Sequence, residues 1–336
     1  MNKCDQYFSA ETSDAFWSDF AELYKNNNAT YLPSRASNVL SCKCIEFPDI
    51  TEASIFDYFF PSNTQIADSL NFINCKFQGE FDSSKFQKLK NLTFDNCEFM
   101  ANADISLASG EKIIINDSVF NANFRIIGFD SRHDSKKFDL KNCSFSAIVD
   151  IENCILEKAK LINIDFKKAT LIFKHTQFEG IKFNEVHWGK KYQANRDTFR
   201  QLKVVLENQK NFIDSQLFYS LELNEYRKEL KQTKLFENIE DKFLFSFNRI
   251  VSNYGQSWTL PLFWLITLSI ALYMGLYCLG LILTYNFNDF MHFFNPLSRT
   301  AGEKFDNIYG IWFLHKIFAG FLIYQFIVAA KRKTKL

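Results

Sequence analysis

The sequence has almost no net charge, few glycines and prolines, and no familiar catalytic signature. Lys and Arg together number 39 and Asp and Glu number 38, which leaves a formal charge of +1. That balance argues against a general nucleic-acid binder, which needs a strong basic field, and against an acidic mimic of DNA. A hydrophobic content of 47% excludes wholesale disorder. We therefore expect a folded protein without a nucleic-acid partner.

Motifs that would identify an enzyme are also missing. The chain contains no GxxxxGK[ST], GxGxxG, HExxH or GxSxG pattern. The histidines are scattered and form no catalytic constellation; they are His133, His175, His187, His292 and His315. We expect no catalytic residue, no cofactor and no metal site, and hence a protein that is not an enzyme.

Phenylalanine is in excess, with 39 residues against 11 glycines and 5 prolines. Many of these residues lie on a grid with a period of five, which fits neither a helix nor a strand. Every fifth residue from Ile151 to Leu171 is apolar, and so is the residue two places before each. Self-similarity at a fixed period indicates a solenoid, in which each repeat buries its apolar face by stacking on the next.

Five hexamers share this pattern: FINCKF (72–77), FDNCEF (94–99), INDSVF (115–120), LKNCSF (140–145) and IENCIL (151–156). They resemble the pentapeptide-repeat family. The resemblance implies a right-handed quadrilateral β-helix over residues 45–190, with about twenty residues per coil. The central residues Phe77, Phe99, Phe120 and Phe145 lie 22, 21 and 25 residues apart, as coils with small insertions would place them. The stretches 100–112 and 131–137 break the grid and predict loops.

The repeat gives the cysteines a structural interpretation. Four of them occupy the minus-two position, where a small inward-facing side chain fits, and free Cys behaves as a small hydrophobe. A zinc site is the competing interpretation, but there is no CxxC pair among them and no His at ligand spacing. We expect reduced packing cysteines without disulfides. The predicted inward ladder is Cys75, Cys97, Cys143, Cys154, Phe77, Phe99, Phe120, Phe145, Leu156 and Phe166.

Helical patterns flank the repeats. Residues 13–25 predict an N-terminal capping helix that shields the end of the solenoid. Residues 195–212 and 214–232 predict a helical hairpin for capping or oligomerisation, and residues 236–254 an amphipathic helix at the membrane interface. The predicted regions are a capping helix and lead-in (1–44), a β-helix (45–190), the hairpin with the juxtamembrane helix (191–256) and a two-span membrane module with a basic tail (257–336).

Two apolar segments predict membrane-spanning helices. Leu260–Tyr285 is an uncharged run of about 26 residues, enough to cross a bilayer core of ~30 Å. Ile308–Ala330 is the second, and the cations that follow it place the C-terminus in the cytoplasm; they are Lys331, Arg332, Lys333 and Lys335. Two crossings, with no apolar signal segment at the start, place the N-terminus there too. Two buried helices of a soluble protein are the alternative.

Polar residues within the second apolar segment are candidate functional residues. His315, Lys316, Tyr324 and Gln325 would line a pore or the interior of a helix bundle, because polar groups inside a bilayer usually face protein or water. The alternative is that Lys316 snorkels to the outer interface and Gln325 packs between helices.

The sequence is compatible with two functions. The order of repeats, helices and spans resembles that of bacterial membrane-attached pentapeptide-repeat proteins, which implies the bacterial inner membrane. The first function is a non-enzymatic scaffold that presents a cytosolic solenoid for protein binding or sensing. The second is an oligomeric pore-forming effector, like an ion channel, such as those of anti-phage defence. The expected partners are the lipid bilayer, further copies of the chain held through the hairpin and spans, and an unidentified cytosolic protein.

Overall fold

The protein forms two compact units in a computed structural model, residues 1–209 and 210–336. The described residues are 19, 34–36, 39–47, 68–85, 89–107, 110–232, 238–281, 287–295, 297 and 308–334. Apart from Asp19, the predicted N-terminal capping helix lies outside them.

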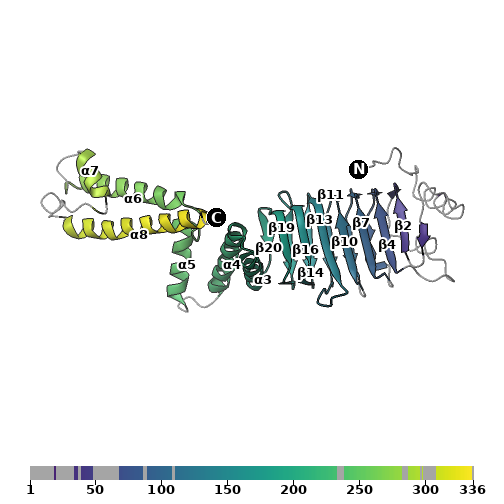
Figure 1. The fold of residues 1–336 in the computed structure, drawn as a ribbon. Helices are drawn as coiled ribbons and strands as arrows, with labels where there is room; N and C mark the ends of the chain where they lie inside the picture. Colours follow the sequence, from purple (N-terminus) through teal and green to yellow (C-terminus); the bar gives the residue numbers. More distant parts are fainter. Residues whose placement is uncertain are drawn as a thin grey trace. The chain divides into compact units, whose positions relative to one another are not determined.

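The first unit is a parallel β-solenoid of about five turns, which confirms the predicted fold class (Figure 1). Its largest sheet contains β1 (Ser34–Ala36), β2 (Val39–Lys43), β3 (Glu46–Phe47), β4 (Ser69–Ile73), β5 (Lys76–Phe77), β7 (Asn91–Asp95), β8 (Glu98–Phe99), β10 (Lys112–Asn116), β11 (Val119–Phe120), β13 (Lys137–Phe145), β16 (Lys160–Asp165) and β19 (Lys182–His187). The second contains β6 (Phe81–Asp82), β9 (Ala103–Ser106), β12 (Phe124–Ile127), β14 (Ile148–Glu152), β17 (Thr170–Lys174) and β20 (Lys191–Gln193). The third contains β15 (Ile155–Glu157) and β18 (Gln177–Glu179).

The strand register follows the hexamers. Phe77 pairs with Phe99, Phe99 with Phe120 and Phe120 with Phe145. Only β1 and β2 pair in antiparallel fashion among the described strands; the other ladders are parallel. The stretch 100–112 is not only a loop, as predicted, because it contains β9. Ala103 and Ile105 point inward from this strand, but neither is the large central residue that would have marked a repeat.

The interior is a stack of aromatic rings. Phe77, Phe99, Phe120 and Phe145 lie face to face, with successive ring centroids 4.4, 4.5 and 4.8 Å apart. The stack continues to Phe166, whose centroid is 5.2 Å from that of Phe145. The spacing of about 4.8 Å between paired strands is close to the stacking distance of offset aromatic rings. A Phe at every coil therefore forms a continuous core.

Asparagine occupies one corner of most coils. Asn74, Asn96, Asn142 and Asn163 all have positive φ, between 53° and 54°, and Asp117 has φ 49°. Asn and Asp tolerate this left-handed conformation better than other non-glycine residues. The side chains also form a ladder: Nδ2 of Asn142 donates to Oδ1 of Asp117 at 2.8 Å, and Nδ2 of Asn163 donates to Oδ1 of Asn142 at 2.9 Å. The Asn of the NC pairs and the Asp of the DS pair at 117–118 are therefore corner residues.

Replacing Asn142 tests this role. Asn142→Ala should lower the free energy of unfolding by about 2 kcal/mol, since Ala is strained in the left-handed region and cannot form the ladder. Asn142→Gly removes the same side chain without the strain, and its loss should be about 1 kcal/mol or less. Chemical denaturation of the full chain in detergent measures both. A loss for Gly as large as that for Ala would contradict the corner assignment.

Helix α3 (Arg196–Asn208) caps the last coil. The Asn195 side chain begins the helix by accepting a hydrogen bond from Thr198 N at 2.8 Å. Gln201 Oε1 accepts from the backbone N–H of Phe178 at 2.9 Å, and Gln209 Nε2 donates to the carbonyl of Ile181 at 2.6 Å. The two glutamine side chains thus satisfy backbone groups of the last coil, which would otherwise be free to pair with a strand of another chain. The first compact unit consequently ends at Gln209, inside the predicted hairpin region.

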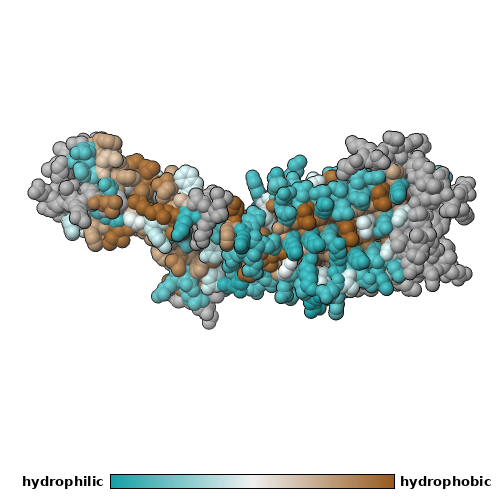
Figure 2. Space-filling view, viewed as in Figure 1, coloured by the Kyte–Doolittle hydropathy of each residue, from teal (hydrophilic) through white to brown (hydrophobic). Residues whose placement is uncertain are grey.

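The second unit is helical. Its helices are α4 (Phe212–Gln232), α5 (Ile239–Ser252), α6 (Thr259–Cys278), α7 (Phe287–Phe294) and α8 (Tyr309–Thr334). Helices α6 and α8 are antiparallel neighbours, since Tyr273 clusters with Trp312 and Leu265 with Leu322. The sequence did not predict α7, which lies in the connection between the two apolar segments. Figure 2 shows hydrophobic residues along α6 and α8, whereas the solenoid surface in this view is mainly hydrophilic.

Candidate functional site

The structure buries every residue of the predicted inward ladder. Cys75, Cys97, Cys143, Cys154, Phe77, Phe99, Phe120, Phe145, Leu156 and Phe166 each expose 3% of their surface or less. Their side chains form the interior of the solenoid. The outer strand faces of the solenoid rest on this packed interior.

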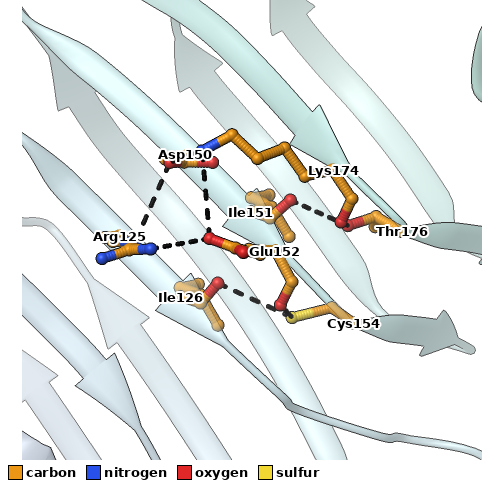
Figure 3. Close-up of polar contacts among 8 residues, drawn as sticks. All are labelled: Arg125, Ile126, Asp150, Ile151, Glu152, Cys154, Lys174 and Thr176. Carbon is orange, nitrogen blue, oxygen red and sulfur yellow. Dashed lines mark hydrogen bonds and ion pairs between the residues drawn. The ribbon is translucent and has the colours of Figure 1, made fainter. Parts of the chain in front are cut away.

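The minus-two side chains also join successive coils. Figure 3 shows Cys154, whose thiol donates to the carbonyl of Ile126 at 3.8 Å, and Thr176, whose hydroxyl donates to Ile151 at 2.8 Å. In the largest sheet the Cys143 thiol donates to Ile115 in the same way, at 3.5 Å. The position thus takes a small or apolar side chain, and where Cys or Thr occupies it the side chain also donates to the neighbouring coil.

Burial keeps these thiols protonated. It raises the pKa of Cys143 to about 12 and that of Cys154 to about 11. A thiol of this kind is a poor nucleophile and a poor metal ligand, because both roles need the thiolate. Within the described part of the chain, no three His, Cys, Asp or Glu side chains gather as metal ligands would.

One cysteine departs from the expectation of reduced thiols. Cys44 is disulfide-bonded, which corrects the prediction that the solenoid carries no disulfide. It occupies the corner position of its coil with φ 52°, so its side chain is not one of the inward ladder. A corner side chain can reach a second cysteine without disturbing the packed interior.

The outer face of the second sheet carries a charge network (Figure 3). Arg125 Nη2 lies 2.6 Å from Glu152 Oε2, and Lys174 Nζ lies 3.0 Å from Asp150 Oδ2. These residues come from β12, β14 and β17, so the network joins three successive coils. Each pair is partly exposed and contributes about 0–1 kcal/mol. Because these charges are paired with one another, the network is a bracing element rather than a ligand site.

In the helical unit, His315 belongs to α8 and its side chain faces α6. It is 8% exposed, its Nε2 lies 2.9 Å from the Ser269 hydroxyl, and its ring stacks on Phe293 of α7 at 4.4 Å. The Ser269 hydroxyl in turn lies 2.7 Å from the carbonyl of Leu265, to which it donates. His315 therefore faces the bundle interior, one of the two settings predicted for it. Sequence reasoning missed Ser269 and Phe293; the signal for Ser269 was a hydroxyl within an otherwise apolar run.

The other three candidates do not join His315. Lys316 lies over the Trp312 ring, with Nζ 3.9 Å from the centroid, a cation–π contact within one helix. Tyr324 is 61% exposed and Gln325 is half-buried, both toward the C-terminal end of α8. These two line a small cavity together with residues of α4 and α5. The four candidates thus lie in three separate environments, His315 beside Ser269, Lys316 over Trp312, and Tyr324 with Gln325 at the cavity, and do not form one row.

The fold defines a class of protein: a β-solenoid in the same chain as a helical unit with two helices long and apolar enough to cross a membrane, Thr259–Cys278 and Tyr309–Lys331. Comparison with known proteins adds no family to this class. No protein-family model matches the chain, and no curated protein matches it.

Proposed function

We propose that this protein is a non-enzymatic scaffold of the bacterial inner membrane that presents its solenoid to a protein partner in the cytoplasm. The exposure of the two apolar helices supports this proposal most directly. Only 28% of the apolar window of α6 and 22% of that of α8 are buried within the chain. The core helices of a soluble protein are mostly buried, whereas lipid covers the exposed side chains of a spanning pair.

Helix α5 supports a membrane-surface location for the region before α6. Ile239, Phe243 and Ile250 are more than half exposed and recur along one stripe of the helix. Trp264 of α6 donates to the carbonyl of Ile250 at 3.0 Å, which holds the end of α5 beside the start of α6. An amphipathic helix in this place would lie in the interface with its apolar stripe toward the acyl chains.

The solenoid is suited to binding because it is rigid and displays flat, polar strand faces. Its five-residue grid and Asn corners support a divergent member of the pentapeptide-repeat family. Solenoids offer extended surfaces on which a partner is bound by side chains from several repeats. Homo-oligomers would form through the helical unit, which carries most of the exposed apolar side chains.

The pore-forming alternative has less support. His315 is hydrogen-bonded to Ser269, and Lys316 is stacked on Trp312, within a single chain. Polar side chains of a pore would instead face a shared aqueous path between copies. The intrachain contacts favour an anchor over an ion-conducting assembly.

Cys278 provides the test of orientation. It is the exposed member of the described free cysteines, at the end of α6 that we place on the outer side of the membrane. A membrane-impermeant maleimide should label it in intact spheroplasts, and Cys278→Ser should abolish the labelling. The other described free thiols are buried and should react only after denaturation. Labelling that requires permeabilised spheroplasts would reverse the proposed orientation.

A further inference from the structure

The outward side of four neighbouring strands of the solenoid is rich in lysine. Strands β10, β13, β16 and β19 pair in this order within the largest sheet (Figure 1). Side chains alternate along each strand, so every second residue points away from the packed interior. The lysines on this side are all exposed; they are Lys112, Lys137, Lys141, Lys160 and Lys182. We call the outward side of these four strands the lysine face.

The strand register places lysine opposite lysine at two points of the lysine face. Lys112 pairs with Lys137 across β10 and β13, and Lys160 pairs with Lys182 across β16 and β19. Neighbouring strands are about 4.8 Å apart, and like charges directly opposite one another destabilise a sheet. The stability of the fold therefore gives no reason for this arrangement.

Charges on the second sheet follow the opposite rule. Its register places Arg125 opposite Asp150 and Glu152 opposite Lys174, so each of these cations faces a carboxylate of the neighbouring coil. Both sheets belong to the same coils, and the chain thus pairs opposite charges on one side of the solenoid while it concentrates like charges on another. Local departures from such pairing rules are typical of functional surfaces.

Most ammonium groups of the lysine face are also without a partner in the chain. Asp139 lies opposite Lys160 in the register, but its Oδ2 is bridged to Lys137 Nζ at 2.9 Å. Within the described part of the chain, no hydrogen bond or ion pair engages the ammonium groups of the other lysines, which are Lys112, Lys141, Lys160 and Lys182. Unpaired cations gathered on one side of a rigid sheet attract an anionic partner.

The residues between the lysines favour a protein as that partner. Ile114 and Ile162 point outward and are partly exposed, and the carboxylate of Asp139 lies among them. A protein segment can contact apolar and acidic side chains as well as lysines, whereas a phosphate-rich surface would be repelled by the carboxylate. No arginine, the residue that binds phosphate in bidentate fashion, occurs in these four strands, all of which are described.

The size of the lysine face suits a short segment. Three strand spacings separate β10 from β19, which gives a width of about 14 Å. We propose that the lysine face binds an acidic segment of a protein partner, whose Asp and Glu carboxylates pair with the lysines while its apolar groups contact Ile114 and Ile162. This inference rests on the proposed scaffold role and deepens it, because it gives the partner a chemistry and the solenoid a binding side.

Fluorescence anisotropy of the full chain in neutral detergent tests the proposal. The probe is a labelled peptide of alternating Glu and Ser residues. We expect the double variant Lys112→Gln/Lys160→Gln to bind this peptide about tenfold more weakly, because two ion pairs are lost. Lys167→Gln/Lys168→Gln is the matched control: it removes the same charge from two exposed lysines in the turn between β16 and β17 and should leave the affinity unchanged.

A stability measurement separates binding from a structural role of the lysines. Because Lys112 and Lys160 each face another lysine, their replacement by Gln should leave the urea midpoint of the full chain unchanged or raise it. A lower midpoint in this double variant than in the unaltered chain would show that the lysines serve the fold, and would overturn the proposal.

The remaining outcomes identify other occupants of the lysine face. Equal weakening in the two double variants would overturn the face as the binding site. Displacement of the peptide by a DNA duplex or by short-chain phosphatidylglycerol, at a lower concentration of negative charge than unlabelled peptide requires, would overturn the protein assignment. The titration in detergent needs no membrane insertion, so a chain that binds the peptide but does not insert in a bilayer would reject the membrane scaffold and keep the lysine face.

Discussion

Phe120→Ala should lower the free energy of unfolding of the solenoid by about 3–5 kcal/mol, the usual cost of truncating a buried Phe. Phe120 is fully buried, and its ring stacks between those of Phe99 and Phe145 at 4.5 and 4.8 Å. The Phe124 ring closes a third side at 4.6 Å. Because parallel pairing fixes the distance between coils, the walls cannot collapse to fill the space that the ring leaves.

Val119 provides the matched control for this variant. It is the neighbouring residue on β11, but its side chain points outward and is 37% exposed. Val119→Ala should change stability by about 0.5 kcal/mol or less. Urea denaturation of the full chain in detergent, followed by circular dichroism, compares the two. Similar losses for both variants would show that the aromatic stack is not the core of the solenoid.

Phe120 lies near the middle of the solenoid, so the width of the unfolding transition provides a second measurement. In a solenoid each coil is stabilised mainly by its neighbours, so a weak central interface reduces the coupling between the two halves. Phe120→Ala should therefore broaden the transition, with a lower denaturant dependence, as well as shift it. A substitution near the capped end, such as Phe166→Ala, should shift the transition with less broadening.

The sequence was sufficient to predict those features that repeat locally. The five-residue grid identified the solenoid, and the central and minus-two residues, from Cys75 to Phe166, are all buried as assigned. The two apolar runs correspond to α6 and α8. In each case the signal is a period or a length that a short window of sequence contains, which is why it can be recognised without the fold.

Features that depend on distant residues were missed. The hydrogen bond between His315 and Ser269 joins residues 46 positions apart, and Gln209 reaches back 28 positions to the edge at Ile181. No local pattern indicates that a glutamine will cap a strand edge. The strand β9 was missed for another reason: its inward Ala103 and Ile105 are too ordinary to stand out from a loop.

Leu268→Arg should release the protein from the membrane if α6 spans it. Leu268 lies at the middle of α6 and is 37% exposed, so an arginine there would face lipid rather than a protein partner. Insertion scales place the cost of Arg at the centre of a span at about 2.5–3.5 kcal/mol, or a hundredfold in the insertion equilibrium. The measured quantity is the fraction of full chain that resists alkaline carbonate extraction, and Leu268→Ala is the control that keeps the site apolar.

The Leu268→Arg variant also distinguishes a membrane-spanning α6 from a helix of a soluble protein. On a soluble protein, an exposed Leu is readily replaced by Arg, and the change would leave fractionation and folding as they were. In a bilayer the result depends on depth, because Arg near the end of a span can snorkel to the interface. Tyr277→Arg, at the exposed end of α6, should therefore remain membrane-bound while Leu268→Arg does not. Equal extraction of both variants and of the unaltered chain would reject the spanning role of α6 and, with it, the proposed membrane scaffold.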